Sequence, residues 1–391
     1  MIMSRFDEVI ERRGTHCAKW DLMETTYGIS PDEGLAMWIA DMDFRPPEAA
    51  TTALRAIVEH GMYGYYGDEA SNHAAICWWM RERHGWTVDP DWILTTHGLV
   101  NGAALCIDAF SAPGDGVVLF TPVYHAFERI LIHAGRSIVS CPLVVKNGRY
   151  TFDLAAYEPL LRGTEKMAVL CSPQNPGGCV WSKEELRSLA DFCRRHDLVL
   201  IADEIHHDLV FPPHRHTPTA LAVPEILDRL IVLTAASKTF NLAGMHTGNL
   251  IVPDDRLRRM VTQRMAALGI SPNSFGMHMA EAVYSPAGAA WLDELLPYLD
   301  RNRRIFDTAI NALDGIHSMP LEATYLAWVD FRGTRYGAQE IADRVFGQAR
   351  IAANLGTTFG SGGEGFLRFN FATPRARVED AVDRLAAAFQ T

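Results

Sequence analysis

The stretch IVLTAASKTFNLAGMHTGNLIV, residues 231–252, places a lysine in an otherwise apolar part of the chain. Residues 231–235 read as a buried strand, because apolar residues follow one another with little polar interruption. Lys238 follows in what reads as a tight turn, and a glycine-containing loop and a second apolar run come after it. The chain has only five lysines against thirty-one arginines. Taken alone, Lys238 also fits a surface lysine at the start of a loop.

Similar apolar runs occur at residues 116–120, 167–171 and 198–202, and a helical pattern with a Ser–Glu capping box lies between the last two. Strands that are apolar on both faces and joined by helices predict a mostly parallel α/β sheet. The segments TYLAWVDF and GFLRFNF, nearer the C-terminus, alternate like antiparallel strands.

These patterns predict two domains. A large α/β domain is expected over residues 47–288, and a smaller α+β domain over residues 289–391. The N-terminal segment, residues 1–46, is expected to join the smaller domain.

Composition limits the partners of the chain. Hydrophobic residues make up 48 % and charged residues 21 %, and the formal net charge is −11. No basic block is present, so neither nucleic acid nor an anionic membrane is expected as a main partner. The seven cysteines are an odd number without a CxxC pair, which predicts free thiols in a reducing cytoplasm.

Two charged residues lie at predicted strand ends, where the loops of an open α/β sheet line a ligand crevice. Lys238 can form a Schiff base with a carbonyl cofactor if its surroundings keep the amine neutral. Asp203 can pair with the pyridinium nitrogen of such a cofactor. A strand-end aspartate is also a common helix cap, so Asp203 alone decides nothing.

Further strand ends carry residues that suit the same crevice. The Asn175 amide can donate to a phenolic oxygen, and the Tyr124 ring can stack on a planar group. Gly98, Leu99 and Val100 can offer backbone N–H groups to a phosphate at a helix start. Each also has a plain structural interpretation, as a turn residue, a core tyrosine or an ordinary strand–helix connection.

Arg368 lies in an otherwise apolar strand and needs a buried anion, either a substrate carboxylate or a structural salt-bridge partner. The GSGGEG segment at 360–365 precedes a strand rather than a helix, so a dinucleotide site is not predicted. His206 and His207 are adjacent on an extended segment and point to opposite faces, so both cannot bind one ion. No metal site is expected.

The order and spacing of Tyr124, Asn175, Asp203, Lys238 and Arg368 resemble those of fold-type I pyridoxal-phosphate enzymes of aminotransferase class I/II. The resemblance covers nearly the whole chain and implies the type I PLP-dependent transferase fold, with pyridoxal 5′-phosphate as cofactor. It implies that Tyr124 stacks on the ring, Asn175 and Asp203 hold it, and Lys238 forms the Schiff base. Arg368 would bind the carboxylate of an amino-acid substrate.

Local motifs resemble the MalY/PatB-type carbon–sulfur β-lyase branch: MWIADMDF, GYYGDEA, TPVYHAF, SPQNPGG, DEIHHDLVF and SKTFNLAG. This chain has His206 where aminotransferases usually have Tyr, and His246 where they carry an arginine that binds phosphate. The resemblance implies that His206 lies at the cofactor, and it leaves open what neutralises the phosphate. Candidates are Ser237, the amides at 98–100, and Tyr65 reaching in from a neighbouring subunit.

The implied function is a homodimeric lyase with shared active sites, which cleaves L-cystathionine or related cysteine S-conjugates to thiol, pyruvate and ammonia. The backbone around Ile39 and Ala40 would close over the substrate carboxylate. An aminotransferase of similar architecture remains open, because the same residues serve transamination. A regulatory protein that binds a transcription factor is a third interpretation, although the sequence shows no large apolar surface patch.

Overall fold

The computed structural model describes residues 4–390. Residues 1–3 of the predicted N-terminal segment and residue 391 of the predicted C-terminal domain lie outside the described residues. Its largest sheet has seven strands in the order β2-β10-β9-β8-β7-β3-β4. β3, β4, β7, β8 and β9 pair in parallel, and β10 is antiparallel to both of its neighbours. The four predicted central strands are confirmed. The strand bounds are β2 (Ile93–Thr96), β3 (Gly116–Thr121), β4 (Ser137–Pro142), β7 (Glu165–Cys171), β8 (Val199–Asp203), β9 (Leu230–Thr234) and β10 (Gly248–Ile251).

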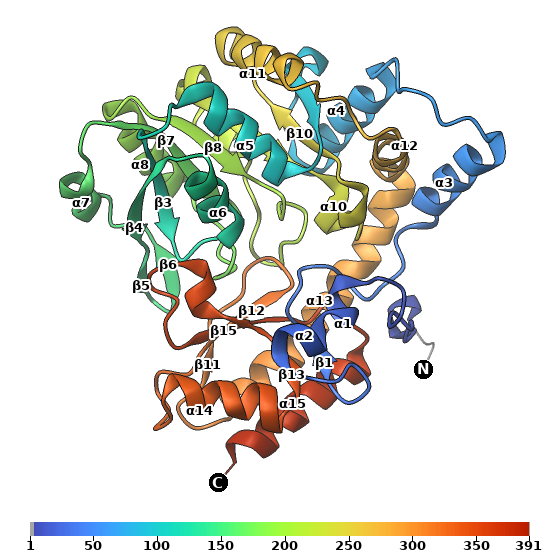
Figure 1. Cartoon of the computed structure of the whole chain (residues 1–391), viewed down its shortest axis with the longest axis vertical. Coiled ribbons are helices and arrows are strands. Elements are labelled where there is room, and N and C mark those ends of the chain that lie inside the picture. The colour runs from blue at the N-terminus through green and yellow to red at the C-terminus, as the bar shows by residue number, and fades with distance from the viewer. Residues whose placement is uncertain (1–3, 391) are drawn as a thin grey trace.

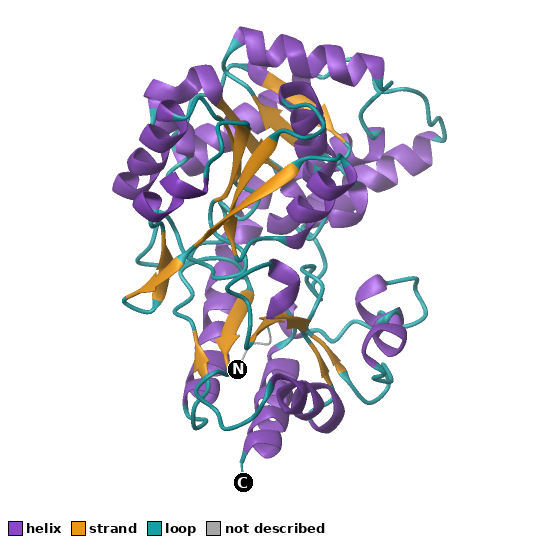
Figure 2. Ribbon diagram, turned by 60° about the vertical axis from the view of Figure 1, so that its left-hand side comes forward, coloured by secondary structure: helices purple, strands orange, loops and turns teal. Residues whose placement is uncertain are grey.

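Helices cover both faces of this sheet, which explains why its strands are apolar on both faces (Figures 1 and 2). One face packs in a core with α5 (Leu99–Phe110), α6 (His125–His133) and α11 (Asp255–Ala267). The opposite face packs in a second core with α4 (Ala70–His84), α8 (Lys183–Arg195) and α12 (Ser274–Val283). The predicted capping box is present at the start of α8, between Ser182 and Glu185.

A smaller sheet of four strands follows in the order β11-β12-β15-β14. β12 (Leu326–Asp330) and β15 (Phe366–Asn370) are antiparallel, which confirms the prediction from their alternating pattern, and Trp328 lies opposite Arg368. β11 (His317–Ser318) and β14 (Asn354–Leu355) complete the sheet. The long helix α13 (Pro286–Asn311) packs against α15 (Arg375–Phe389) and runs between the two sheets in Figure 1.

The N-terminal segment lies against the C-terminal part of the chain. β1 (Leu35–Ala36) pairs in parallel with β13 (Ile351–Ala352), and the Asn370 side chain donates to the carbonyl oxygens of Ile39 and Asp41. The blue helices α1 (Ala18–Asp21) and α2 (Met23–Tyr27) accordingly lie near the red C-terminal elements in Figure 1.

The shorter elements connect these layers. They are α3 (Glu48–His60), α7 (Leu154–Tyr157), α9 (Thr219–Ala222), α10 (Ala236–Thr239), α14 (Ala338–Ala342), β5 (Val144–Lys146) and β6 (Arg149–Thr151). Short 3₁₀ helices cover Arg5–Asp7, Pro90–Trp92, Glu158–Leu160, Pro224–Arg229, Ala243–Met245 and Gly356–Phe359, and Asp343–Gln348 is π-helical. Within residues 4–390, the helices are too short or too polar to span a bilayer.

Candidate active site

A cavity of about 620 Å³ opens at the carboxyl ends of β7, β8 and β9. Side chains from both sheets and backbone of the N-terminal segment line it. Twelve of the residues predicted from the sequence line this cavity: Ile39, Ala40, Gly98, Leu99, Val100, Tyr124, Asn175, Asp203, His206, Ser237, Lys238 and Arg368. Tyr65 does not.

Lys238 extends its amine into the cavity from α10, which follows β9 directly. The sequence predicted a tight turn here, and the chain instead forms one turn of helix. Nζ donates to the Ala40 carbonyl oxygen at 2.6 Å, and within residues 4–390 no carboxylate forms an ion pair with it. Desolvation lowers the pKa of Lys238 to about 8. The amine therefore reaches its neutral, nucleophilic form much closer to neutral pH than an ordinary lysine does.

Asp203 is the last residue of β8 and is only 5 % exposed. Its carboxylate accepts a hydrogen bond from the Ile205 amide at 3.1 Å, and no basic side chain of the described residues forms an ion pair with it. Burial raises the pKa of Asp203 to about 7. A buried carboxylate without a cation is suited to a ligand that brings positive charge.

Arg368 lies in the middle of β15, is 2 % exposed, and faces the cavity. Its guanidinium donates to Asn175 Oδ1 at 3.0 Å, to the Trp38 carbonyl oxygen at 3.0 Å and to Asn354 Oδ1 at 2.7 Å. All three acceptors are neutral, and none of the described residues accepts a hydrogen bond from Nε. Desolvation lowers the pKa of Arg368 to about 10. Across the described part of the chain no carboxylate pairs with Arg368, so the structural salt bridge is not the reason for its burial.

Asn175 is oriented by this contact. Its oxygen must face Arg368, because a guanidinium can only donate. The Asn175 NH₂ group therefore remains available to donate to another acceptor in the cavity, as predicted for a phenolic oxygen.

The start of α5 also faces the cavity. Gly98 has φ +84°, in the region that favours glycine, and it places the first N–H groups of the helix where they have no partner within the helix. Ser237 and His246 line the same end of the cavity. Free N–H groups at a helix start are suited to an anion.

Four residues at or near the cavity were not predicted as site residues. Trp38 and Asn354 hold Arg368 as described above, and the Tyr325 hydroxyl donates to the Ala40 carbonyl oxygen at 3.0 Å. His125 follows Tyr124, its Nδ1 has no partner, and burial lowers its pKa to about 4, so its imidazole is neutral. Trp38 belongs to the MWIADMDF motif, which was a usable signal, but nothing local marks Asn354 or Tyr325.

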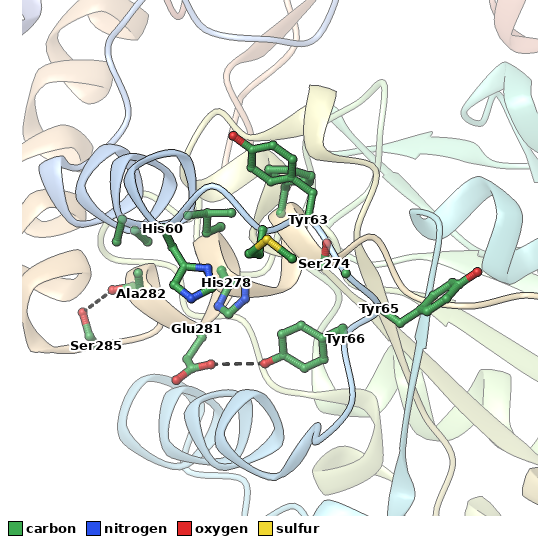
Figure 3. A pocket seen from close by; sticks show the side chains of 15 residues that line it. His60, Tyr63, Tyr65, Tyr66, Ser274, His278, Glu281, Ala282 and Ser285 are labelled. Atoms are coloured by element: carbon green, nitrogen blue, oxygen red, sulfur yellow. Dashed lines mark hydrogen bonds between the residues drawn. The ribbon is translucent and has the colours of Figure 1, made fainter.

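Tyr65 lies in a different place. It is fully exposed in the segment between α3 and α4, beside a surface hollow lined by Tyr63, Tyr66 and His278 among others. In Figure 3 the Tyr65 side chain points away from the other labelled residues, while Tyr66 points toward Glu281. Within one chain Tyr65 cannot contribute to the cavity that holds Lys238.

A mixed α/β sheet with a desolvated lysine at a strand end, an unpaired buried aspartate and an unpaired buried arginine defines a cofactor-dependent enzyme of amino-acid chemistry. Residues 37–385 match the family described as aminotransferase class I and II, and the chain belongs to this family.

Individual relatives narrow the comparison. Cystathionine beta-lyase PatB of Bacillus subtilis (strain 168) is 36 % identical over 386 residues, covering 98 % of this chain and 99 % of that protein. The crystal structure of cystalysin from Treponema denticola, which contains a pyridoxal 5′-phosphate cofactor, superposes with a TM-score of 0.93 at 34 % identity and covers 99 % of both chains. The pyridoxal-phosphate-bound C-S lyase of Staphylococcus hominis gives a TM-score of 0.90 at 28 % identity, covering 100 % of this chain and 99 % of that one.

Proposed function

We propose that this protein is a pyridoxal-phosphate-dependent carbon–sulfur β-lyase that cleaves L-cystathionine or related cysteine S-conjugates to a thiol, pyruvate and ammonia. The observation that carries the proposal is a single cavity that brings together three charged groups, Lys238, Asp203 and Arg368, none of which forms an ion pair with another residue of the described part of the chain. The similarity to lyases along the whole chain supports the reaction type.

The cavity residues fit pyridoxal phosphate. Asp203 suits a protonated ring nitrogen, the free amine of Lys238 suits an aldehyde, and the start of α5 suits a phosphate. The Tyr124 ring and the Asn175 NH₂ group are placed in the same cavity for the ring face and its phenolic oxygen. When bound, the cofactor supplies an electron sink for the carbon that loses its proton.

The residues of the chain then have separate tasks. Arg368 binds the α-carboxylate of the substrate, and the Trp38 and Asn354 contacts fix its guanidinium plane. Lys238, once its amine is free, removes the proton from the α-carbon as general base. Asp203 keeps the proton on the ring nitrogen. The β-thiolate leaves as a thiol after protonation, and one water is consumed as the remainder hydrolyses to pyruvate and ammonia.

The reaction can be tested with purified protein saturated with pyridoxal phosphate. L-Cystathionine or S-alkyl-cysteines are supplied without any 2-oxo acid, and pyruvate and free thiol are both measured. The proposal expects equal amounts of the two products. Turnover that starts only after a 2-oxo acid is added would instead identify an aminotransferase, and no turnover under either condition would reject the proposed activity.

We also propose a homodimer in which Tyr65 completes the phosphate site of the partner. Tyr65 and the neighbouring Met62 and Tyr63 are strongly exposed apolar residues, which is unusual for a surface without a partner. His246 lines the Lys238 cavity beside Gly98 at the start of α5, and a hydroxyl from a second chain would supply a further donor there.

Mixing two inactive variants tests this arrangement. In a dimer formed from a Lys238→Ala chain and a Tyr65→Ala chain, one site has an intact Lys238 together with a Tyr65 from its partner. Because random mixing makes half of the dimers hybrid, about a quarter of the wild-type activity should return if the dimer is symmetric. No recovery on mixing, while light scattering shows dimers, would exclude a role of Tyr65 across the interface.

We also propose that the protein is located in the cytoplasm. All seven cysteines are free thiols and five of them are buried, which suits a reducing compartment. Cell fractionation that placed the protein in the periplasm or outside the cell would contradict this assignment.

A further inference from the structure

A second cluster of polar side chains lies behind the cavity, on the segment that follows β8. Glu204, His207 and His216 are buried, and none of them lines the cavity that holds Lys238. His84, at the end of α4, and Asp208 pack beside them. The proposed lyase chemistry uses none of these five residues.

The two carboxylates of the cluster have no strongly basic partner. Glu204 accepts from the Thr219 amide at 2.7 Å and lies 3.0 Å from His216 Nε2. Asp208 accepts from Trp79 Nε1 at 3.0 Å, from Thr239 Oγ1 at 2.7 Å, and lies 2.8 Å from His84 Nε2. Among residues 4–390, no lysine or arginine forms an ion pair with either carboxylate. Buried carboxylates of this kind need a cation, which is either a protonated histidine or a bound metal ion.

His207 is the most unusual member. It is only 2 % exposed, yet neither of its ring nitrogens makes a hydrogen bond within the described residues. Its Nε2 lies 3.3 Å from Asp208 Oδ2, close but outside hydrogen-bonding geometry. A buried imidazole without partners is costly, so each such group requires an explanation.

We propose that Glu204, His207 and His216 bind a divalent transition-metal ion of the zinc type. One carboxylate oxygen and one ring nitrogen from each histidine all lie within 4.8 Å of one another. In a tetrahedral zinc site with bonds of about 2.0–2.1 Å, neighbouring ligand atoms are about 3.3 Å apart, so small side-chain shifts bring these three ligand atoms to that spacing, and a water molecule would supply the fourth ligand. Two imidazoles and a carboxylate are ligands that zinc accepts.

Ring geometry selects this set of ligands over a second one. The rings of His207 and His216 lie 6.0 Å apart at 59°, so nitrogen lone pairs, which lie in the ring planes, can converge on one ion. A second group has ligand atoms that also lie within 4.8 Å of one another, and it consists of His84, His207 and Asp208. However, the His84 and His207 rings are stacked at 4.1 Å and 26°, so their nitrogen lone pairs lie in nearly parallel planes that do not meet at one ion. His84 and Asp208 are therefore positioning residues, with Asp208 beside the second nitrogen of His207 as carboxylates often are in metal sites.

The ion would tie together the two ends of residues 204–216, directly after Asp203. His206 takes no part, since it faces the cavity instead. His206 and His207 lie in a turn rather than on the expected extended segment, and they still serve different sites, because His216 supplies the second imidazole here. The site was not expected from the sequence, since its two histidines are nine residues apart on an irregular segment.

The test uses holoenzyme without a histidine tag, freed of unbound cofactor and dialysed against a chelator. Co²⁺ and then Zn²⁺ are added, and the visible absorbance of bound Co²⁺ and the metal content per chain are recorded. We expect one ion per chain, with Zn²⁺ displacing Co²⁺. His207→Gln and His216→Gln should each weaken binding at least about 100-fold, more than a typical change outside the ligand shell.

His214→Ala is the matched control, because His214 lies on the same segment, its side chain is 42 % exposed, and it does not belong to the set. This variant should bind Co²⁺ like the wild type. X-ray absorption of the zinc-loaded wild type, which needs no variant to fold, should show two imidazole ligands. The proposal is overturned if the wild type binds no stoichiometric ion, if His207→Gln and His216→Gln bind as tightly as the wild type, or if all three variants lose the ion equally.

Discussion

The amines of Lys19 and Lys238 both lie inside the protein, but the groups around them differ. Lys19 is fully buried and its Nζ lies 3.0 Å from Asp43, a carboxylate that also receives Arg12 at 2.7 Å. Among residues 4–390, the Lys238 amine donates a hydrogen bond only to the Ala40 carbonyl oxygen, and Asp203 in the same cavity accepts one only from a backbone amide. In one region the buried charges satisfy one another, and in the other they do not.

The two aspartates show the consequence. Burial alone would raise the pKa of Asp43, but Lys19, Arg12 and Arg377 hold it down at about 2. Burial raises the pKa of Asp203 to about 7, because the Ile205 amide and the more distant charge of Lys238 only partly offset the desolvation. Mutual pairing therefore identifies a structural charge cluster, and buried charge without pairing identifies a place for a ligand.

The largest effect is expected from removing the unpaired lysine. Lys238→Ala should lower pyruvate formation from L-cystathionine by at least about 10⁴-fold, because the general base is lost. The long-wavelength absorbance of the bound cofactor should disappear, while the unfolding midpoint in urea changes little. Lys146→Ala, at an exposed position, is the control. If Lys238→Ala keeps more than one-hundredth of the wild-type activity, Lys238 is not the general base, and the contrast with Lys19 does not hold.

Removing the paired lysine, Lys19, should lower stability and leave catalysis unchanged. Lys19→Met leaves Asp43 buried with fewer cations, and breaking such a cluster costs about 3 kcal/mol of unfolding free energy. Urea unfolding followed by tryptophan fluorescence measures the loss. The kcat of the molecules that remain folded should match the wild type. A variant as stable as the wild type would show that the Lys19 cluster is not structural.

A third variant addresses the unpaired arginine. Arg368→Gln should lower kcat/KM by about 10²-fold, because a charged bond to the substrate carboxylate is lost. Stability should be unchanged or improved, since no carboxylate is left without a partner. If instead the protein unfolds at markedly lower urea and kcat/KM holds, Arg368 belongs with the structural charges.

The smallest effect concerns pH. With a pKa of about 8, Lys238 is neutral in about one-tenth of molecules at pH 7 and about nine-tenths at pH 9. Cofactor uptake by cofactor-free protein, followed by absorbance, should therefore accelerate about tenfold across this range and level off. A lysine of ordinary pKa would give a steeper rise without levelling. Pyridoxamine phosphate, which has no aldehyde, controls for other pH effects.

Site residues could be predicted from the sequence where they lie at or just after the end of a predicted strand. Asp203 and Lys238 could be placed together because parallel strands end at one edge of the sheet. The sequence was uninformative where a contact has no local pattern, because Asn354 meets Arg368 through strand pairing and the Tyr325 hydroxyl meets the backbone of Ala40, far away in the chain. His84 and His216 were missed for the same reason, since neither has a local spacing that relates it to His207.

The pairing of β1 with β13, and of Asn370 with the backbone near Ala40, sets the order of events during biosynthesis. Residues 37–44 leave the ribosome early but cannot take their final place until residues 351–370 have followed. The cavity wall near Lys238 is therefore finished only when synthesis is nearly complete. A nascent chain that stops short of β13 therefore has Lys238 but lacks Arg368, and its residues 37–44 have no C-terminal strand to pack against.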